Sequence, residues 1–126
     1  LAEGNIAFDH NGAAWVAVLP TLYRIPRKGD KETFYAQGCG DVGNGNVKIT
    51  QDSTVWIYTD NGLFSFNWYK KEFKTFTIRD GLVNNTINGL VSGRNRNFWL
   101  ATPRGLSKFV YDNHTFINYF KTKFSG

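Results

Sequence analysis

The sequence has no methionine, a single cysteine and only two histidines among its 126 residues. Because no methionine begins it, we expect this chain to be a trimmed piece of a longer translation product. The lone Cys39 excludes a disulfide bond within the chain and any zinc site made only of cysteines. No apolar run approaches the roughly 20 residues that cross a bilayer, and no segment resembles a signal peptide. We therefore expect a soluble segment, whose parent could still be anchored.

Charge of one sign is also not concentrated along the chain. The sequence has 15 Lys and Arg against 10 Asp and Glu, a net charge of +5, which raises the question of a nucleic-acid partner. The basic residues are spread over all three thirds of the sequence, and no zinc-finger spacing, recognition-helix pattern or single-strand motif accompanies them. Solvated strand faces and turns explain this spread, so we predict no direct nucleic-acid contact.

Aromatic and β-branched residues are abundant instead. Hydrophobic residues make up 41% of the chain and aromatic residues 17%, enough apolar surface for a folded domain. Apolar residues recur at every second position in the short runs 55–59, 63–66 and 73–78, which predicts strands. Dipeptides such as Asn61-Gly62 and Asp80-Gly81 between them predict tight turns. With only three Glu and no amphipathic helical pattern, the sequence predicts an all-β fold.

Three tryptophans mark an internal repeat. Trp15, Trp56 and Trp99 are separated by 41 and 43 residues, and each stands in a similar stretch of sequence. The copies cover residues 1–45, which form a degenerate repeat, 46–86 and 87–126. In the second copy we expect four strands, near 47–50, 55–59, 63–67 and 74–78. Four strands in about 40–45 residues are typical of a β-propeller blade.

A propeller also explains the tryptophans, since a large ring on the second strand of each blade would fill the layer between blades. We therefore expect Trp15, Trp56 and Trp99 to be core residues and not sugar platforms. Three blades do not close a ring that needs roughly 4–8. We predict a β-propeller fragment of about three four-stranded antiparallel blades, belonging to one larger propeller domain. An antiparallel sandwich is the alternative, but it would not predict the near-constant tryptophan spacing.

Two motifs in the repeat resemble a known family. They read Trp56-Ile57-x-Thr59-x-x-Gly62-Leu63, then Asp80-Gly81-Leu82-x-Asn84, and again Trp99-Leu100-x-Thr102-x-x-Gly105-Leu106. This combination resembles the two-component regulator propeller repeat. In that family the repeats form tandem propellers in the periplasmic sensor region of hybrid two-component histidine kinases, best known from gut Bacteroides that sense complex glycans. The resemblance implies a parent with more blades, an immunoglobulin-like domain, a membrane helix, a kinase core, a receiver and a DNA-binding output module.

The sequence departs from this repeat at several positions. The family usually has Gly where this chain has Tyr58 and Ala101. The first copy has Val18 in place of the Thr, and Pro20-Thr21 where the Gly is expected. Since Gly weakens a strand interior, these changes are tolerable, and they affect the blade boundaries more than the family resemblance.

Other motifs do not point to catalysis. Residues 38–43 spell the G-x-G-x-x-G dinucleotide fingerprint, but they precede a predicted strand and not a helix, so we interpret them as a loop. His10 and His114 stand in turns without a catalytic signature, and Cys39 has no basic neighbour that would lower its pKa. The carboxylates fall mostly at turns. We expect no catalytic residue, no cofactor and no metal in this segment.

Three side chains remain as ligand-binding candidates. Trp68 lies outside the repeat at a predicted turn, where its ring could stack on a sugar face or pack against a neighbouring blade. Arg94 and Arg96 lie in the turn at 93–97, where they could hold an anionic ligand, meet a partner domain or be solvated.

The leading functional hypothesis rests on the resemblance. It is a ligand-sensing propeller segment, on the periplasmic side of an inner-membrane sensor kinase, which recognises an oligosaccharide and signals to the cytoplasm. Its expected partners are the remaining blades of the parent and a second copy of that parent in a homodimer. A non-catalytic structural or protein-interaction propeller is the alternative. A propeller lyase or glycosidase is the third hypothesis.

Overall fold

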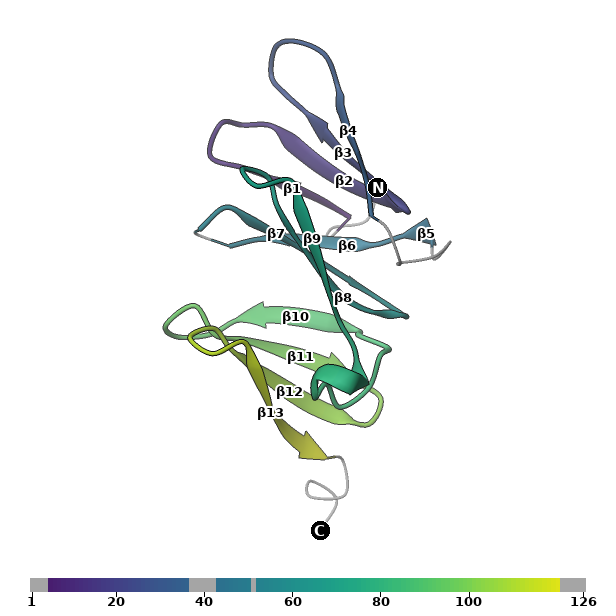
Figure 1. The fold of residues 1–126 in the computed structure, drawn as a ribbon, viewed down its shortest axis with the longest axis vertical. Coiled ribbons are helices and arrows are strands. Elements are labelled where there is room, and N and C mark those ends of the chain that lie inside the picture. The colour runs from purple at the N-terminus through teal and green to yellow at the C-terminus, as the bar shows by residue number, and fades with distance from the viewer. Residues whose placement is uncertain (1–4, 37–42, 51, 121–126) are drawn as a thin grey trace. The chain divides into compact units, whose positions relative to one another are not determined.

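The structure is a computed structural model that describes residues 5–36, 43–50 and 52–120. Its described part consists of three antiparallel sheets and one turn of 3-10 helix (Figure 1). The first sheet contains β1 (Ile6–Phe8), β2 (Ala14–Leu19), β3 (Thr21–Ile25) and β4 (Glu32–Tyr35), and the short β5 (Gly43–Asn44) pairs with β2. The second contains β6 (Asn46–Ile49), β7 (Thr54–Thr59), β8 (Gly62–Asn67) and β9 (Glu72–Phe76). The third contains β10 (Gly89–Ser92), β11 (Phe98–Thr102), β12 (Gly105–Val110) and β13 (Thr115–Phe120).

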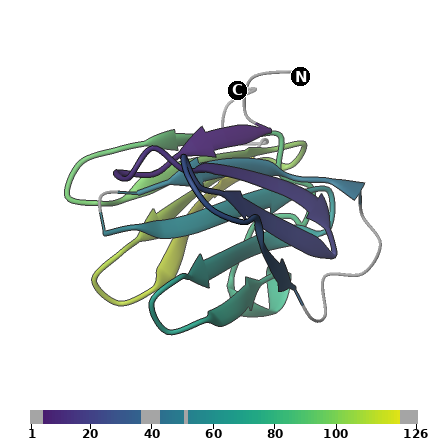
Figure 2. The ribbon, with the colours of Figure 1, turned by 90° about the horizontal axis from the view of Figure 1, so that it is seen from above.

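Each sheet is a meander, because its four main strands pair in the order in which they follow one another in the chain. Figure 2 shows from above that neighbouring strands of a sheet cross at a slant, the twist expected of L-amino-acid strands. The prediction of an all-β fold with three four-stranded antiparallel sheets is therefore confirmed. The first sheet has one strand more than expected, since β5 pairs Asn44 with Val18 and Gly43 with Leu19.

The hairpins of the second and third sheets share one turn device. The Thr59 hydroxyl donates a hydrogen bond to the carbonyl of Gly62 and accepts one from the backbone N–H of Asn61. The Thr102 hydroxyl likewise donates to the carbonyl of Gly105 and accepts from the N–H of Arg104. Gly62 has a φ of 107°, a left-handed conformation that favours glycine. The Thr-x-x-Gly part of the repeat therefore encodes a tight turn.

The first hairpin is built differently. Val18 pairs with Thr21 around a turn that contains a cis peptide bond between Leu19 and Pro20. A proline at the second turn position has no N–H to donate, and valine has no hydroxyl to accept it. The first copy thus keeps the hairpin while losing the Thr and Gly of the other two.

The fourth strand of the second sheet begins and ends two residues earlier than predicted. The alternating pattern predicted a strand as far as residue 78, but β9 ends at Phe76 and the helical turn η1 (Ile78–Asp80) follows. Thr77 caps this turn, because its hydroxyl accepts from the N–H of Arg79 while its own N–H donates to the Asp80 carboxylate. A capping box competes with strand pairing for the same backbone groups, and here it prevails.

The motif after this turn is also structural. Gly81 ends η1 with a φ of 104°, and Leu82 is buried. The side chain of Asn84 accepts a hydrogen bond from the N–H of Thr86. Asp80, Gly81 and Leu82 therefore form a capped connection that leads toward the third sheet.

By contacts, the described chain divides into two compact units. The first comprises residues 1–57 with 64–75, and the second comprises 58–63 with 76–126. In the first unit the Trp15 ring stacks against Phe34 at 5.9 Å between centroids, and Phe66 lies 4.7 Å from Phe34. These rings join a buried cluster of small and branched apolar residues from β2, β3, β6, β7 and β8. Sheet-to-sheet burial of aromatic rings thus forms the core of this unit.

The second unit has its own aromatic core. Phe98 stacks on Phe109 at 4.7 Å, and Phe76 and Phe116 approach Phe109 at 5.8 and 5.3 Å. The buried Ser107 hydroxyl accepts a hydrogen bond from the N–H of Val83, which ties the connecting segment to β12. Each unit therefore has a hydrophobic core.

Candidate functional site

A buried arginine lies at the centre of the most distinctive polar group in the first unit. The register of the first sheet places Ala7, Trp15, Arg24 and Glu32 side by side in one row across four strands. Arg24 is only 6% exposed, and its guanidinium bonds to Asp9 at 2.9 Å and to Glu32 at 2.6 Å. A buried guanidinium with two carboxylate partners is satisfied, whereas a lone one would be costly.

Asp9, in the turn after β1, collects four hydrogen bonds. One carboxylate oxygen accepts from the N–H groups of Asn11 and Ala13, and the other accepts from the Trp15 indole and from Arg24. Burial by itself would raise the pKa of this carboxyl. The bonds from Trp15, Ala13 and Arg24 outweigh burial, so the pKa of Asp9 lies below its ordinary value. Asp9 therefore stays ionised and fixes the β1–β2 turn.

The two partners respond in the same way. Burial opposes the charged form of Glu32, but the bonds from Arg24 and Trp68 lower the pKa of this carboxyl below its ordinary value. Burial likewise opposes charge on Arg24, yet its bonds to Glu32 and Asp9 raise the pKa of the guanidinium. The three groups thus hold one another in their charged states.

Trp68 covers this network. It stands in the turn between β8 and β9, where the Asn67 side chain accepts a bond from the N–H of Lys70. The Arg24 guanidinium lies 4.2 Å from the centroid of the Trp68 ring, and the indole N–H donates to Glu32 at 3.2 Å. Of the two roles expected for Trp68, packing against the neighbouring sheet is thus present in the structure.

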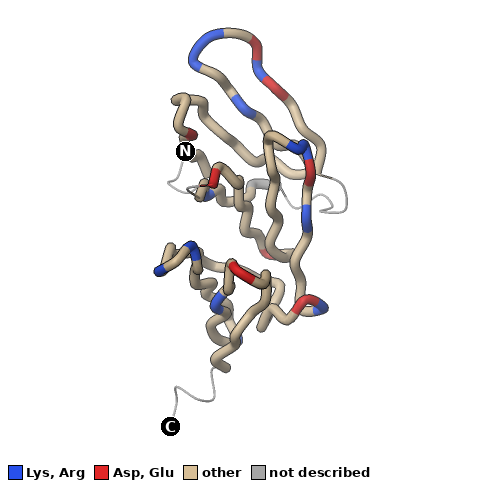
Figure 3. Tube along the Cα trace, turned by 60° about the vertical axis from the view of Figure 1, so that its left-hand side comes forward, with Lys and Arg blue, Asp and Glu red and all other residues tan. Residues whose placement is uncertain are grey.

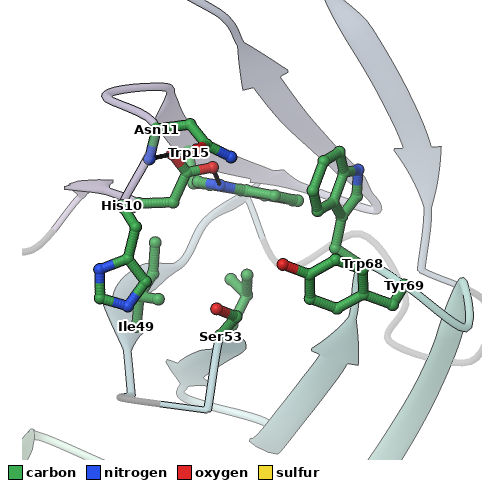
Figure 4. A pocket seen from close by; sticks show the side chains of 9 residues that line it. His10, Asn11, Trp15, Ile49, Ser53, Trp68 and Tyr69 are labelled. Carbon is green, nitrogen blue, oxygen red and sulfur yellow. Dashed lines mark hydrogen bonds between the residues drawn. The ribbon is translucent and has the colours of Figure 1, made fainter.

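A small pocket of about 80 Å³ opens beside this network. It is lined by Asp9, His10, Asn11, Trp15, Ile49, Ser53, Val55, Trp68 and Tyr69. Figure 4 shows the Trp68 and Tyr69 rings on one side and His10 on the other, with the Tyr69 hydroxyl turned toward Ser53. The lining comes from the β1–β2, β6–β7 and β8–β9 turns and from the adjoining strands β2, β6 and β7, so three turns of the first unit converge on it.

Within the described residues, the charges outside this network do not form a continuous stripe. Figure 3 shows basic and acidic segments alternating, most clearly around the turn between β3 and β4, which carries Lys28, Asp30 and Lys31. No group of three or more His, Cys, Asp or Glu in the described residues is placed to hold a metal ion. In the same part of the chain, no helix is long and apolar enough to span a membrane.

Solved structures share this arrangement of sheets. The extracellular domain of the hybrid two-component system protein BT3049 of B. thetaiotaomicron matches 94% of this chain with a TM-score of 0.77 and 20% sequence identity. A catalytically inactive virginiamycin B lyase from Staphylococcus aureus matches 90% of it with a TM-score of 0.73 and 16% identity. The chain has the β-propeller fold.

Another match involves the extracellular domain of the B. thetaiotaomicron protein BT4673, with a TM-score of 0.56 and 18% identity over 91% of this chain. The chain spans only 17% of the BT3049 domain, 39% of the lyase and 21% of the BT4673 domain. No family model and no curated protein matches the sequence. Extracellular domains of hybrid two-component systems are thus among the solved structures with this propeller fold, as the repeat resemblance led us to expect.

The three sheets are accordingly propeller blades, and the repeat residues have structural places in them. Trp15 and Trp56 are buried, whereas Trp99 is only partly buried. Leu63 is also buried, and Leu106 is partly buried. In the third blade, Val91, Trp99, Lys108 and Ile117 form the row that corresponds to the Arg24 row of the first. Trp99 therefore lies on a face that includes the exposed Val91 and Ile117, and this face differs from the closed core expected for it.

The other ligand candidates lie apart from the pocket lining. Arg94 and Arg96 belong to the second unit and are exposed in the turn between β10 and β11. The Arg96 guanidinium lies 5.1 Å from the centroid of the Tyr111 ring. His114 contacts Phe109 and Tyr111, while His10 lines the pocket. Cys39 and most of the 38–43 run lie outside the described residues.

In the sequence alone, Asp9 is one of the carboxylates at turns and Arg24 is one of the basic residues spread along the chain. The signal that could have identified Arg24 was its place in the strand. It lies two positions after Leu22 and so shares the inward face of β3. A charged residue on an inward face must find partners, and Asp9 and Glu32 are two of the five acidic residues in the first repeat.

Proposed function

We propose that this chain is a non-catalytic segment of the extracytoplasmic propeller of a hybrid two-component sensor. In this proposal the parent lies in the inner membrane, recognises an oligosaccharide in the periplasm and passes the signal to a cytoplasmic kinase and a transcriptional output. The observation that carries it is the match of 94% of the chain to the extracellular domain of a hybrid two-component system protein. The repeat motifs around Trp56 and Trp99 support the same assignment.

The exposed blade faces support the part of the proposal that concerns partners. In the third blade, Val91 is 66% exposed and Ile117 is 46% exposed beside Trp99. In the first blade, Phe8 and Tyr35 are exposed on the face opposite to Trp15. Apolar faces of this kind are the surfaces on which further blades stack. We expect the remaining blades of the parent to cover them, and we expect the parent to signal as a homodimer.

Signalling of this kind requires that the ligand bind two arrangements of the sensor with different affinity. The test uses the full chain that carries these residues, reconstituted in membrane vesicles, with an array of oligosaccharides as probes. We expect at least one oligosaccharide both to bind and to change the autophosphorylation rate. Binding without any change in that rate across the array would contradict the sensor function.

The two alternatives have distinct outcomes in the same preparation. A structural or protein-interaction propeller would bind no oligosaccharide and would instead retain a protein partner. The similarity to a virginiamycin B lyase keeps a propeller enzyme as the second candidate. Cleavage of a bound oligosaccharide or of quinupristin by the full chain would support that candidate and exclude a purely binding role.

A further inference from the structure

The charged groups of the network beside the Trp68 pocket are already paired with one another. A carboxylate has about four lone-pair positions, and the four donors on Asp9 occupy them. Arg24 is shared between two carboxylates and covered by the Trp68 ring. A metal ion or a cationic ligand would have to displace bonds already made. An anionic ligand would face the ionised Asp9 without an available guanidinium.

Neutral hydrogen-bonding groups are available in the same pocket. The side chains of Asn11, Ser53 and Tyr69 line it, and within the described residues no hydrogen bond engages their amide or hydroxyl groups. In Figure 4 the Asn11 amide and the Tyr69 hydroxyl both point into the space between the turns. An amide and two hydroxyls provide donors and acceptors for a polyhydroxylated ligand.

The aromatic side of the pocket is held in place before any ligand arrives. Trp68 is fixed by its bond to Glu32 and by the Arg24 guanidinium over its ring. Tyr69 lies against Trp68 with ring centroids 5.2 Å apart, yet it is 71% exposed. An immobilised aromatic wall loses little conformational entropy when a flat apolar surface packs on it. The exposed ring of Tyr69 leaves area for such a contact.

The size of the pocket limits what can enter it. A cavity needs roughly 10–15 Å³ to hold one water molecule. The pocket of about 80 Å³ therefore holds several waters or part of one sugar ring. A ring with an apolar C–H face and peripheral hydroxyls matches both the aromatic wall and the neutral polar groups. We infer that the pocket formed by Asn11, Ser53, Trp68 and Tyr69 binds one neutral glycosyl unit of an oligosaccharide. This inference rests on the proposed function and specifies its site and ligand class.

The experiment measures binding to the full chain that carries these residues, by titration calorimetry. The probes are the neutral trisaccharides cellotriose, maltotriose and xylotriose, with trigalacturonic acid as the charged counterpart. The variants are Tyr69→Ala and Asn11→Ala. The control is Lys28→Ala, because Lys28 is exposed in the turn between β3 and β4, in the same unit but outside the pocket. All three side chains are exposed, so these variants should fold, which circular dichroism checks.

We expect a neutral trisaccharide to bind and trigalacturonic acid not to bind. Loss of the Tyr69 ring should weaken the neutral ligand about fivefold or more, and loss of the Asn11 amide about threefold. Lys28→Ala should leave the dissociation constant within about twofold of wild type.

Each other outcome has a separate meaning. Neutral binding that neither Tyr69→Ala nor Asn11→Ala weakens would overturn the pocket and leave the proposed function standing. Binding of trigalacturonic acid alone would overturn the neutral ligand class while retaining oligosaccharide recognition. If the wild-type chain binds none of these probes nor any glycan of a wider array, both the pocket assignment and the proposed recognition are wrong.

Discussion

The first and third blades contain corresponding rows of residues across their strands, in two different environments. In the first blade, Trp15 pairs with Arg24, and in the third, Trp99 pairs with Lys108. Trp15 is 1% exposed and stacks with Phe34, and its indole donates to a carboxylate. Trp99 is only partly buried and has Tyr119 at 5.7 Å and the Lys108 ammonium at 5.6 Å from its ring. The repeat therefore places a tryptophan at the same position in both blades, but the two tryptophans differ in burial.

The difference shows what completes a blade face. In the first unit, rings from the next blade cover Trp15, and the cation beside it is neutralised by Asp9 and Glu32. In the third blade the corresponding cation, Lys108, lies over an aromatic ring on a face with exposed apolar side chains. An apolar row with one basic group is complementary to a blade that brings aromatic rings and a carboxylate. Substitutions in the two rows can test this comparison.

The largest contrast should come from the tryptophans themselves. Trp15→Ala should reduce the free energy of unfolding by about 3–5 kcal/mol, since it opens a cavity among Phe34 and Phe66 and removes a donor from Asp9. Trp99→Ala should cost about 1 kcal/mol or less, because its ring is partly solvated already. Guanidinium unfolding of the 126-residue chain, followed by circular dichroism, measures both. Equal costs would mean that the two rows are equally buried and that the comparison fails.

The basic residues beside the tryptophans give the next contrast. Arg24→Met leaves the carboxylates of Asp9 and Glu32 without their shared cation, and we expect a loss of about 3 kcal/mol. Lys108→Met should change stability by about 0.5 kcal/mol or less. Arg24→Lys serves as the control, because it keeps the charge but lacks the fork that reaches two carboxylates. If Arg24→Met leaves the free energy of unfolding unchanged, the network does not stabilise the fold.

Acid should weaken the first unit through the same network. The pKa values of Asp9 and Glu32 are lowered in the folded chain, so their contribution is complete above their ordinary pKa near 4. It is lost as the pH falls through their lower folded values. Wild type should therefore lose stability between about pH 5 and about pH 2, and Arg24→Met should lose less over that interval. Hydrogen exchange of the β2 and β3 amides at several pH values follows this unit separately. If wild type and Arg24→Met lose stability equally over this pH interval, the network is not the cause of the acid sensitivity.

Much of the architecture was predictable because it depends on local patterns. Alternating apolar residues and the Thr-x-x-Gly turns encode the hairpins directly. The error at β9 had a local cause too, since Ile78 continued the strand pattern while Thr77 and Asp80 formed a capping box. A capping box can be read from sequence, but whether it wins over one more strand pair depends on the tertiary context.

The candidate site was less predictable because its parts are far apart in the sequence. Trp68 reaches Glu32 across 36 positions, and Asp9 reaches Arg24 across 15. Single-sequence patterns indicate that Trp68 stands outside the repeat, but they do not say which residue its ring contacts. The pocket, likewise, exists only once three turns from two blades converge. Strand register and packing determine which distant residues come into contact, and composition does not show this.

The smallest expected effects concern the hairpin turns, where the first blade again differs from the others. Thr59→Val should cost about 1–2 kcal/mol and Thr102→Val about 1 kcal/mol, because each loses two hydrogen bonds and the Thr59 hydroxyl is the more deeply buried. Val18→Thr should stay within about 0.5 kcal/mol of wild type. The position that donates an N–H to the hydroxyl in the other blades is Pro20 here, and proline has no N–H. Urea unfolding midpoints measure all three substitutions. Stabilisation by Val18→Thr as large as the loss from Thr102→Val would show that the first turn can use the same device and differs from the others only in sequence.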